Sequence, residues 1–119
     1  MSTPQSNPPV SPSFPLADNI RAAYQDLYDM LEAEFQSNPD ATAREAIRPA
    51  RDNVENLLTK DNMCKWDADT ALFSATLQQF KDANDGLKTL QEQIGETASH
   101  FSTAGSILAA VTKVFSLIP

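Results

Sequence analysis

The side chains best suited to catalysis or metal binding are few in this chain and form no recognisable motif. There is one histidine, His100, and one cysteine, Cys64, and they lie 36 positions apart. A single cysteine excludes an internal disulfide and a cysteine-based metal site. Neither a His-Glu-x-x-His motif nor a glycine-rich phosphate loop occurs. The sequence therefore predicts no catalytic residue, no cofactor-binding residue and no metal site, and a protein that is not an enzyme.

Three acids are the remaining candidates for chemistry. Asp26, Asp29 and Glu32 follow one another at intervals of three, which places them on one helix face where carboxylates can hold a metal. Solvated acids on an outer face are much the commoner arrangement, and we expect that here. With a formal net charge of −7, the chain is also a poor electrostatic partner for nucleic acid. His100 is expected to be a surface or hydrogen-bonded polar residue.

A heptad pattern in the second half of the chain indicates the main structural element. Large apolar residues recur every seven positions, which corresponds to two turns of an α-helix. The positions three and four residues further along are smaller or polar, which favours packing within the chain over a self-sufficient coiled coil. The first member of the stripe is expected to plug the end of the bundle. The stripe consists of Trp66, Phe73, Phe80, Leu87, Ile94, Phe101, Leu108 and Phe115.

Two shorter amphipathic helices are predicted before this stripe. The first covers about residues 17–36, with Asp18 as its N-cap. The second begins either at Asn38-Pro39 or with a capping box that starts at Thr42, and it ends near residue 62. Each helix has apolar residues spaced alternately four and three apart, so each presents one face to a core.

The predicted fold is all-α. We expect an antiparallel helical bundle of three long helices over residues 16–119, preceded by an extended proline-rich arm over residues 1–15. The third helix is possibly broken near Gly95, which would give four helices. Pro49 removes a backbone donor inside the second helix and is expected to kink or restart it.

The C-terminal segment suggests what the protein does. From Phe101 to Ile118 the only charged residue is Lys113, and apolar residues occupy more than one face. A 119-residue bundle does not comfortably hide so much apolar surface. The sequence therefore predicts a helical interaction module that binds a protein partner or itself through this segment. The predicted partner-binding residues are Ile107, Leu108, Val111, Val114, Phe115 and Ile118.

Two alternatives stay open. The segment is the central helix of the bundle and is buried nearly all round, or the protein is membrane-active and residues 101–118 insert conditionally. As one helix this segment would span roughly 27 Å, slightly less than the hydrocarbon core of about 30 Å. The order of acidic amphipathic helices followed by an apolar helix resembles helical pore-forming toxins and helical secretion-system components. The first residues lack the basic and apolar regions of a Sec signal peptide. We expect a cytoplasmic protein, or one exported without such a signal.

Overall fold

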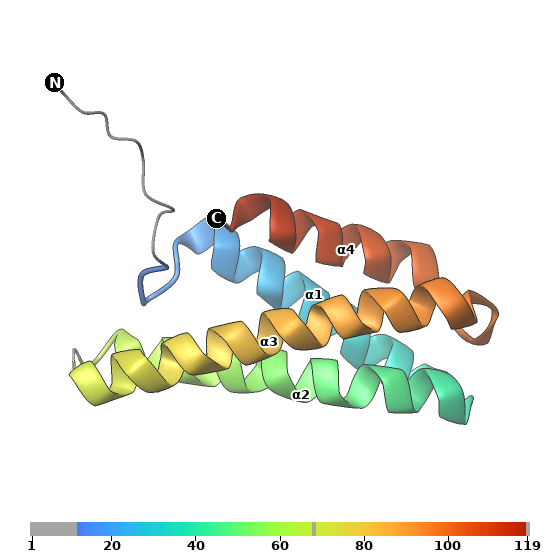
Figure 1. Ribbon diagram of the computed structural model, residues 1–119, viewed down its shortest axis with the longest axis horizontal. Coiled ribbons are helices and arrows are strands. Elements are labelled where there is room, and N and C mark those ends of the chain that lie inside the picture. The colour runs from blue at the N-terminus through green and yellow to red at the C-terminus, as the bar shows by residue number, and fades with distance from the viewer. Residues whose placement is uncertain (1–11, 68, 119) are drawn as a thin grey trace, which may run out of the picture.

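The computed structural model describes residues 12–67 and 69–118, and this part of the chain is helical without strands. Residues 1–11, which hold most of the predicted proline-rich arm, lie outside the described residues. The elements, labelled in Figure 1, are α1 (Asp18–Ser37), α2 (Ala41–Cys64), α3 (Thr70–Thr97), the short 3-10 helix η1 (Ala98–His100) and α4 (Ala104–Leu117).

The four α-helices run alternately in opposite directions along the long axis of the molecule (Figure 1). Helix α2 packs against α1 and α3, and α4 packs mainly against α1 and to a smaller extent against α3. Each helix therefore turns its apolar face towards a common core. The core includes the fully buried side chains of Leu27, Leu31, Ile47, Leu57, Leu87, Leu90, Ile94, Ile107 and Val111.

Aspartates cap two of the helices. The Asp40 side chain accepts a hydrogen bond from the N–H of Ala43 at 3.1 Å, so the N-cap of α2 is neither Asn38 nor Thr42 as predicted. Helix α3 begins at Thr70, with Asp69 as its cap, and not at Trp66, where the heptad stripe begins. The predicted N-cap of α1 was also wrong, because Ala17 occupies that position and Asp18 lies in the first turn.

Pro49 does not restart its helix, and the long stripe breaks near Gly95, two residues beyond it. Helix α2 continues through Pro49, which is exposed, as is Glu45, whose carbonyl loses its usual backbone donor. Water can therefore satisfy that carbonyl. Helix α3 continues through Gly95 and ends at Thr97. The glycine does not adopt a positive φ angle, so the break in the long stripe does not depend on glycine geometry.

The heptad stripe is buried in its middle and not at its start. Phe80 is 8% exposed and Leu87 and Ile94 are fully buried, whereas Phe73 is 39% exposed and Trp66 85% exposed. Trp66 precedes the first residue of α3, so the helical period does not determine where its side chain points. The prediction that Trp66 plugs the bundle was therefore wrong.

Candidate interaction surface

Half of the predicted contact set lies inside the core. Ile107, Val111 and Val114 are each 0% exposed, on the side of α4 that packs within the bundle. In the folded chain these three side chains stabilise the fold and present no surface to a partner. The other three predicted residues are half-buried and pack against the edge of the core: Leu108, Phe115 and Ile118.

Glu34, near the end of α1, holds the start of α4. Its side chain is 2% exposed. One carboxylate oxygen accepts from the Ser102 N–H at 2.8 Å and from the Asn38 amide at 2.7 Å. The other accepts from the Thr103 N–H at 3.0 Å and from its hydroxyl at 2.6 Å. Burial alone raises the pKa of Glu34, but these hydrogen bonds favour the charged form more strongly and lower the pKa below its ordinary value.

A second set of hydrogen bonds joins the α1–α2 turn to η1. The Asn38 amide donates to the backbone carbonyl of His100 at 2.8 Å, and the Asn38 side-chain oxygen accepts from the N–H of Asp40 at 2.9 Å. His100 Nδ1 lies 2.9 Å from Asp40 Oδ2. This bond to His100 is the main reason that the pKa of Asp40 is lowered. We call this part of the molecule the closed end, defined by Glu34, Asn38, Asp40, His100, Ser102 and Thr103.

The aromatic ring beside the closed end is covered by arginines. Phe35 is 8% exposed. The guanidinium carbons of Arg44 and Arg51 lie 4.0 and 4.2 Å from the centre of its ring, and that of Arg48 lies 5.5 Å away. Arg51 also pairs with Glu32 at 3.1 Å. Cation–π contacts and the aliphatic stems of the arginines thus keep this ring from water.

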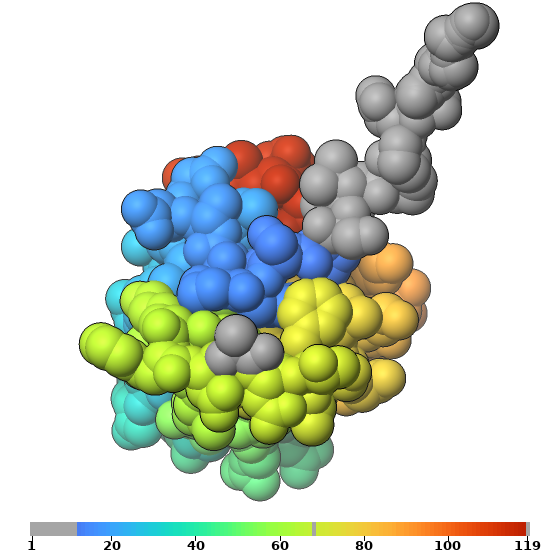
Figure 2. Space-filling view, turned by 90° about the vertical axis from the view of Figure 1, so that its left-hand side faces the viewer, coloured from blue at the N-terminus to red at the C-terminus, as the bar shows by residue number. Residues whose placement is uncertain are grey.

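The opposite end of the molecule leaves apolar side chains in water. Met63 is 50% exposed, Trp66 85% and Phe73 39%, and all three come from the end of α2, the connection and the first turn of α3. We call these three residues the apolar end. Figure 2 shows this side of the molecule, where the yellow-green and yellow residues of the connection lie beside the blue segment that precedes α1.

The segment before α1 borders the apolar end. The Phe14 ring packs edge-on against Phe73, with 5.5 Å between ring centres, and against Phe80 at 5.9 Å. Leu16 is 6% exposed, and its N–H donates to Asp61 Oδ1 at 2.6 Å. The chain therefore enters the bundle along one side of this surface.

A buried ion pair supports the apolar end from below. Asp61, in the last turns of α2, is 0% exposed, and its second oxygen lies 2.6 Å from Arg21 Nη1 of α1. The same Arg21 nitrogen also donates to the carbonyl of Leu58 at 3.4 Å. The two carboxylate oxygens of Asp61 thus connect the segment before α1, and α1 itself, to α2. These bonds hold together the elements that lie next to the exposed apolar side chains.

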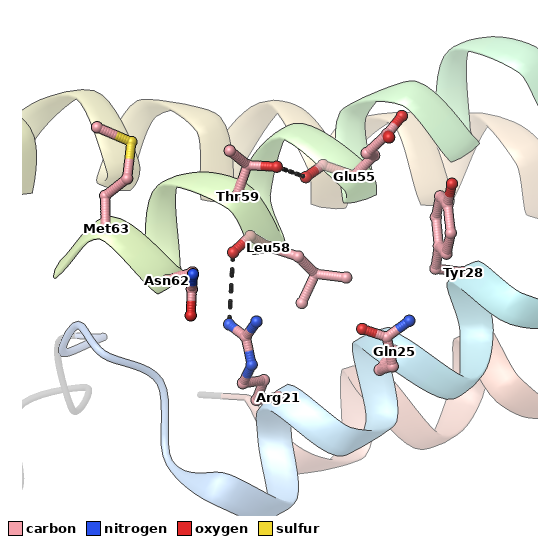
Figure 3. A pocket seen from close by; sticks show the side chains of 8 residues that line it. All are labelled: Arg21, Gln25, Tyr28, Glu55, Leu58, Thr59, Asn62 and Met63. Carbon is pink, nitrogen blue, oxygen red and sulfur yellow. Dashed lines mark hydrogen bonds between the residues drawn. The ribbon is translucent and has the colours of Figure 1, made fainter. Parts of the chain in front are cut away.

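A groove of about 400 Å³ between α1 and α2 extends to the apolar end (Figure 3). Arg21 on one side is already bonded to the carbonyl of Leu58 on the other, and Met63 lies at one end of the set of lining residues. The lining is mostly polar and forms no cluster of catalytic groups. It consists of Arg21, Gln25, Tyr28, Glu55, Leu58, Thr59, Asn62 and Met63.

The side chains with the greatest chemical reactivity are not brought together. Cys64 belongs to the end of α2, with its sulfur 3.4 Å from the Thr76 hydroxyl, whereas His100 belongs to the closed end. Within residues 12–67 and 69–118, no three histidine, cysteine or acidic side chains are arranged to hold a metal ion, and this includes Asp26, Asp29 and Glu32. No helix in the same residues combines the length and apolarity needed to cross a membrane.

Comparison with protein-family models, with curated proteins and with solved structures finds no match for this chain. Its function must therefore be argued from the surfaces described above. The sequence pattern identified α4 as the contact element but did not single out the connection between α2 and α3. The sequence did offer one signal for this connection. Trp66 lies four residues beyond the predicted end of the second helix, near residue 62, and heptad spacing does not determine burial outside a helix.

Proposed function

We propose that this protein is a non-enzymatic helical interaction module that associates through its apolar end. The observation that carries the proposal is the 85% exposure of Trp66. Tryptophan is enriched among the few residues that dominate the energy of protein interfaces. Trp66 is the most exposed of the large apolar side chains among the described residues, and recognition of a partner would account for its exposure.

The partner that best fits this surface is a second copy of the chain. An apolar patch does not repel its own copy, and a two-fold axis brings the same patch of each molecule together. The exposed charges beside Trp66 have both signs, with Lys65 on one side and Asp67 on the other. Across a two-fold axis, Lys65 of each copy can face Asp67 of the other. Charge complementarity of this kind fixes the register of an interface.

Helix α4 runs back towards the start of α1 and ends beside it, short of the connection between α2 and α3 (Figure 1). Its half-buried residues Leu108, Phe115 and Ile118 are therefore not included in the proposed surface at the apolar end. A partner contact through these three residues stays a separate prediction.

The test is the dependence of molecular mass on concentration for the intact protein and for Trp66→Ser. Because the removed side chain is exposed, the variant should fold normally, and the dimer should dissociate about 30-fold more readily, as for the loss of a central interface tryptophan. Met30→Ser is the matched control, because Met30 is 38% exposed but lies beside α4 in the pocket between α1 and α4. Met30→Ser should associate as the intact protein does.

A monomeric mass from micromolar to millimolar concentration would falsify the proposal of self-association. Equal weakening by Trp66→Ser and Met30→Ser would also contradict it, since the contact would then not depend on the apolar end. Circular dichroism of each variant establishes that the helical fold is kept.

A further inference from the structure

The groove between α1 and α2 shares a residue with the apolar end. Met63 belongs to both, and its carbonyl accepts a hydrogen bond from the N–H of Trp66 at 3.0 Å. The backbone of Trp66 therefore lies directly beyond one end of the groove. The Trp66 side chain is 85% exposed and is not part of the lining of its own groove. The groove is thus a hollow that borders the proposed contact surface.

Apolar and polar side chains meet in the groove at the end next to the apolar end. Leu58 is 7% exposed and supplies apolar surface together with Met63. The Arg21 side chain extends from α1, and that of Asn62 points from α2 towards α1 (Figure 3). The Arg21 guanidinium is held by Asp61 at 2.6 Å and by the Leu58 carbonyl at 3.4 Å. Its position is therefore fixed before a partner binds.

An indole ring has the chemistry that this groove can accommodate. The face of the ring carries partial negative charge and attracts a guanidinium such as that of Arg21. The indole N–H needs an acceptor when it is buried, and the lining offers the side-chain oxygens of Asn62 and Glu55. The rest of the ring can pack on Leu58 and Met63. A volume of about 400 Å³ is within the range of sites that bury small organic molecules, so it can hold one indole.

We infer that Trp66 of each copy inserts into the α1–α2 groove of the other copy. This inference rests on the proposed function, because it names the receiving site for the same contact. In an isologous dimer, a contact between a residue of one copy and a site on the other occurs twice, once in each direction. Because the groove ends where Trp66 begins, a two-fold axis near Met63 brings each indole to the groove of the other copy. Each dimer then contains two equal contacts.

The first part of the test fills the groove without changing Trp66. Asn62 is exposed and its side chain lies between the two helices, so Asn62→Tyr should occupy the space that the indole needs. The dimer should dissociate about 30-fold more readily, as for Trp66→Ser, because both contacts are lost. Asn56→Tyr is the matched control, because Asn56 is also an exposed asparagine of α2 but does not line the groove. The control should associate as the intact protein does.

The second part of the test mixes the two weakened variants. Trp66→Ser keeps an open groove and contains no tryptophan, since Trp66 is the only one, whereas Asn62→Tyr keeps the indole. A mixed dimer regains one of the two contacts. It should therefore dissociate only about 5-fold more readily than the intact dimer, which is the square root of the 30-fold loss. The tryptophan emission of Asn62→Tyr should also shift to shorter wavelength as Trp66→Ser is added.

These results separate the inference from the proposed function. Weaker association of Asn62→Tyr, with recovery in the mixture, supports insertion into the groove. Normal association of Asn62→Tyr, when Trp66→Ser is weakened, overturns the inference and leaves the contact through the apolar end standing. Weakening of both variants without recovery in the mixture also overturns it, because the two copies of Trp66 would then contact each other. Monomers at every concentration contradict both proposals.

Two controls keep the test decisive. Equal weakening by Asn56→Tyr and Asn62→Tyr overturns the inference, because the effect would then not depend on the groove. Circular dichroism establishes that each variant keeps its helical fold. If Asn62→Tyr loses that fold, Gln25→Tyr takes its place, because Gln25 is an exposed residue that lines the groove from α1.

Discussion

The two ends of this molecule differ in how far their aromatic side chains are exposed to water. At the closed end, Phe35 lies beneath three guanidinium groups, and the turns are joined by the hydrogen bonds of Glu34 and Asn38. At the apolar end, Trp66 is 85% exposed, with no comparable cover among the described residues. Polar bonding is present at both ends, because Asp61 at the apolar end accepts hydrogen bonds from the Leu16 N–H and from Arg21.

This comparison indicates that Trp66 is not exposed because its end of the molecule lacks hydrogen bonds between elements. Asp61 anchors the entering chain and α1 beneath the apolar end, so the base of that surface is fixed. Among residues 12–67 and 69–118, no side chains cover Trp66 as the arginines cover Phe35. We therefore propose that the closed end mainly stabilises the fold and that the apolar end binds a partner, so substitutions at the two ends should have separable effects.

The largest effect on folding is expected for Glu34→Ala at the closed end. The substitution removes the carboxylate that accepts hydrogen bonds from the Ser102 N–H and from the N–H and hydroxyl of Thr103. These donors recover only part of the lost hydrogen-bond energy by bonding to water. The free energy of unfolding should fall by about 2 kcal/mol, measured by urea denaturation. Glu32→Ala is the matched control, two positions earlier on the same helix. It removes a partly exposed pair with Arg51 and an exposed hydrogen bond from Gln36, and it should cost about 0.5 kcal/mol.

The contribution of Glu34 should also depend on pH. Its pKa in the folded chain lies below the ordinary value of 4.5, so the stability that it supplies is fully present above that value. This stability is lost as the pH falls through the pKa of the folded state. The difference in unfolding free energy between the intact protein and Glu34→Gln should therefore shrink on acidification below pH 4.5. A difference that grows with acidification would mean that the buried carboxyl is protonated in the native state.

The smallest effect on folding is expected for Trp66→Ser at the apolar end. Little apolar surface is buried by an 85% exposed side chain, so the free energy of unfolding should change by no more than about 0.5 kcal/mol. Urea denaturation followed by circular dichroism measures this without the tryptophan signal. A loss of unfolding free energy comparable to that of Glu34→Ala would contradict the proposal that only the closed end contributes strongly to stability.

Much of the fold was predictable because it follows from local periodicity. The apolar spacing located the first two helices and the buried middle of the stripe, including Leu87 and Ile94. The reversal between α3 and α4 lies near Gly95, where it was expected, with Thr97 as the last residue of α3. Glu34 and Asn38, more than sixty positions away, supply hydrogen bonds to the reversal. Sequence spacing does not reveal contacts of that range.

The candidate site was less predictable for a related reason. The six residues on α4 were recognised as apolar, but an apolar pattern does not distinguish a face buried against α1 from one left for a partner. Ile107 and Val111 belong to the first kind. Trp66 was assigned to the core because it continues the heptad count. Helix α3 begins only after Asp69 has capped it, so Trp66 lies outside the helix to which that count applies.

The central claim, that the chain associates through its apolar end, is tested most directly by the emission of Trp66 as the protein concentration is raised. The account predicts a shift to shorter wavelength over the same concentration range in which the molecular mass doubles, because the contact removes the ring from water. A mass that doubles while the emission spectrum stays constant would place the contact elsewhere and contradict the account.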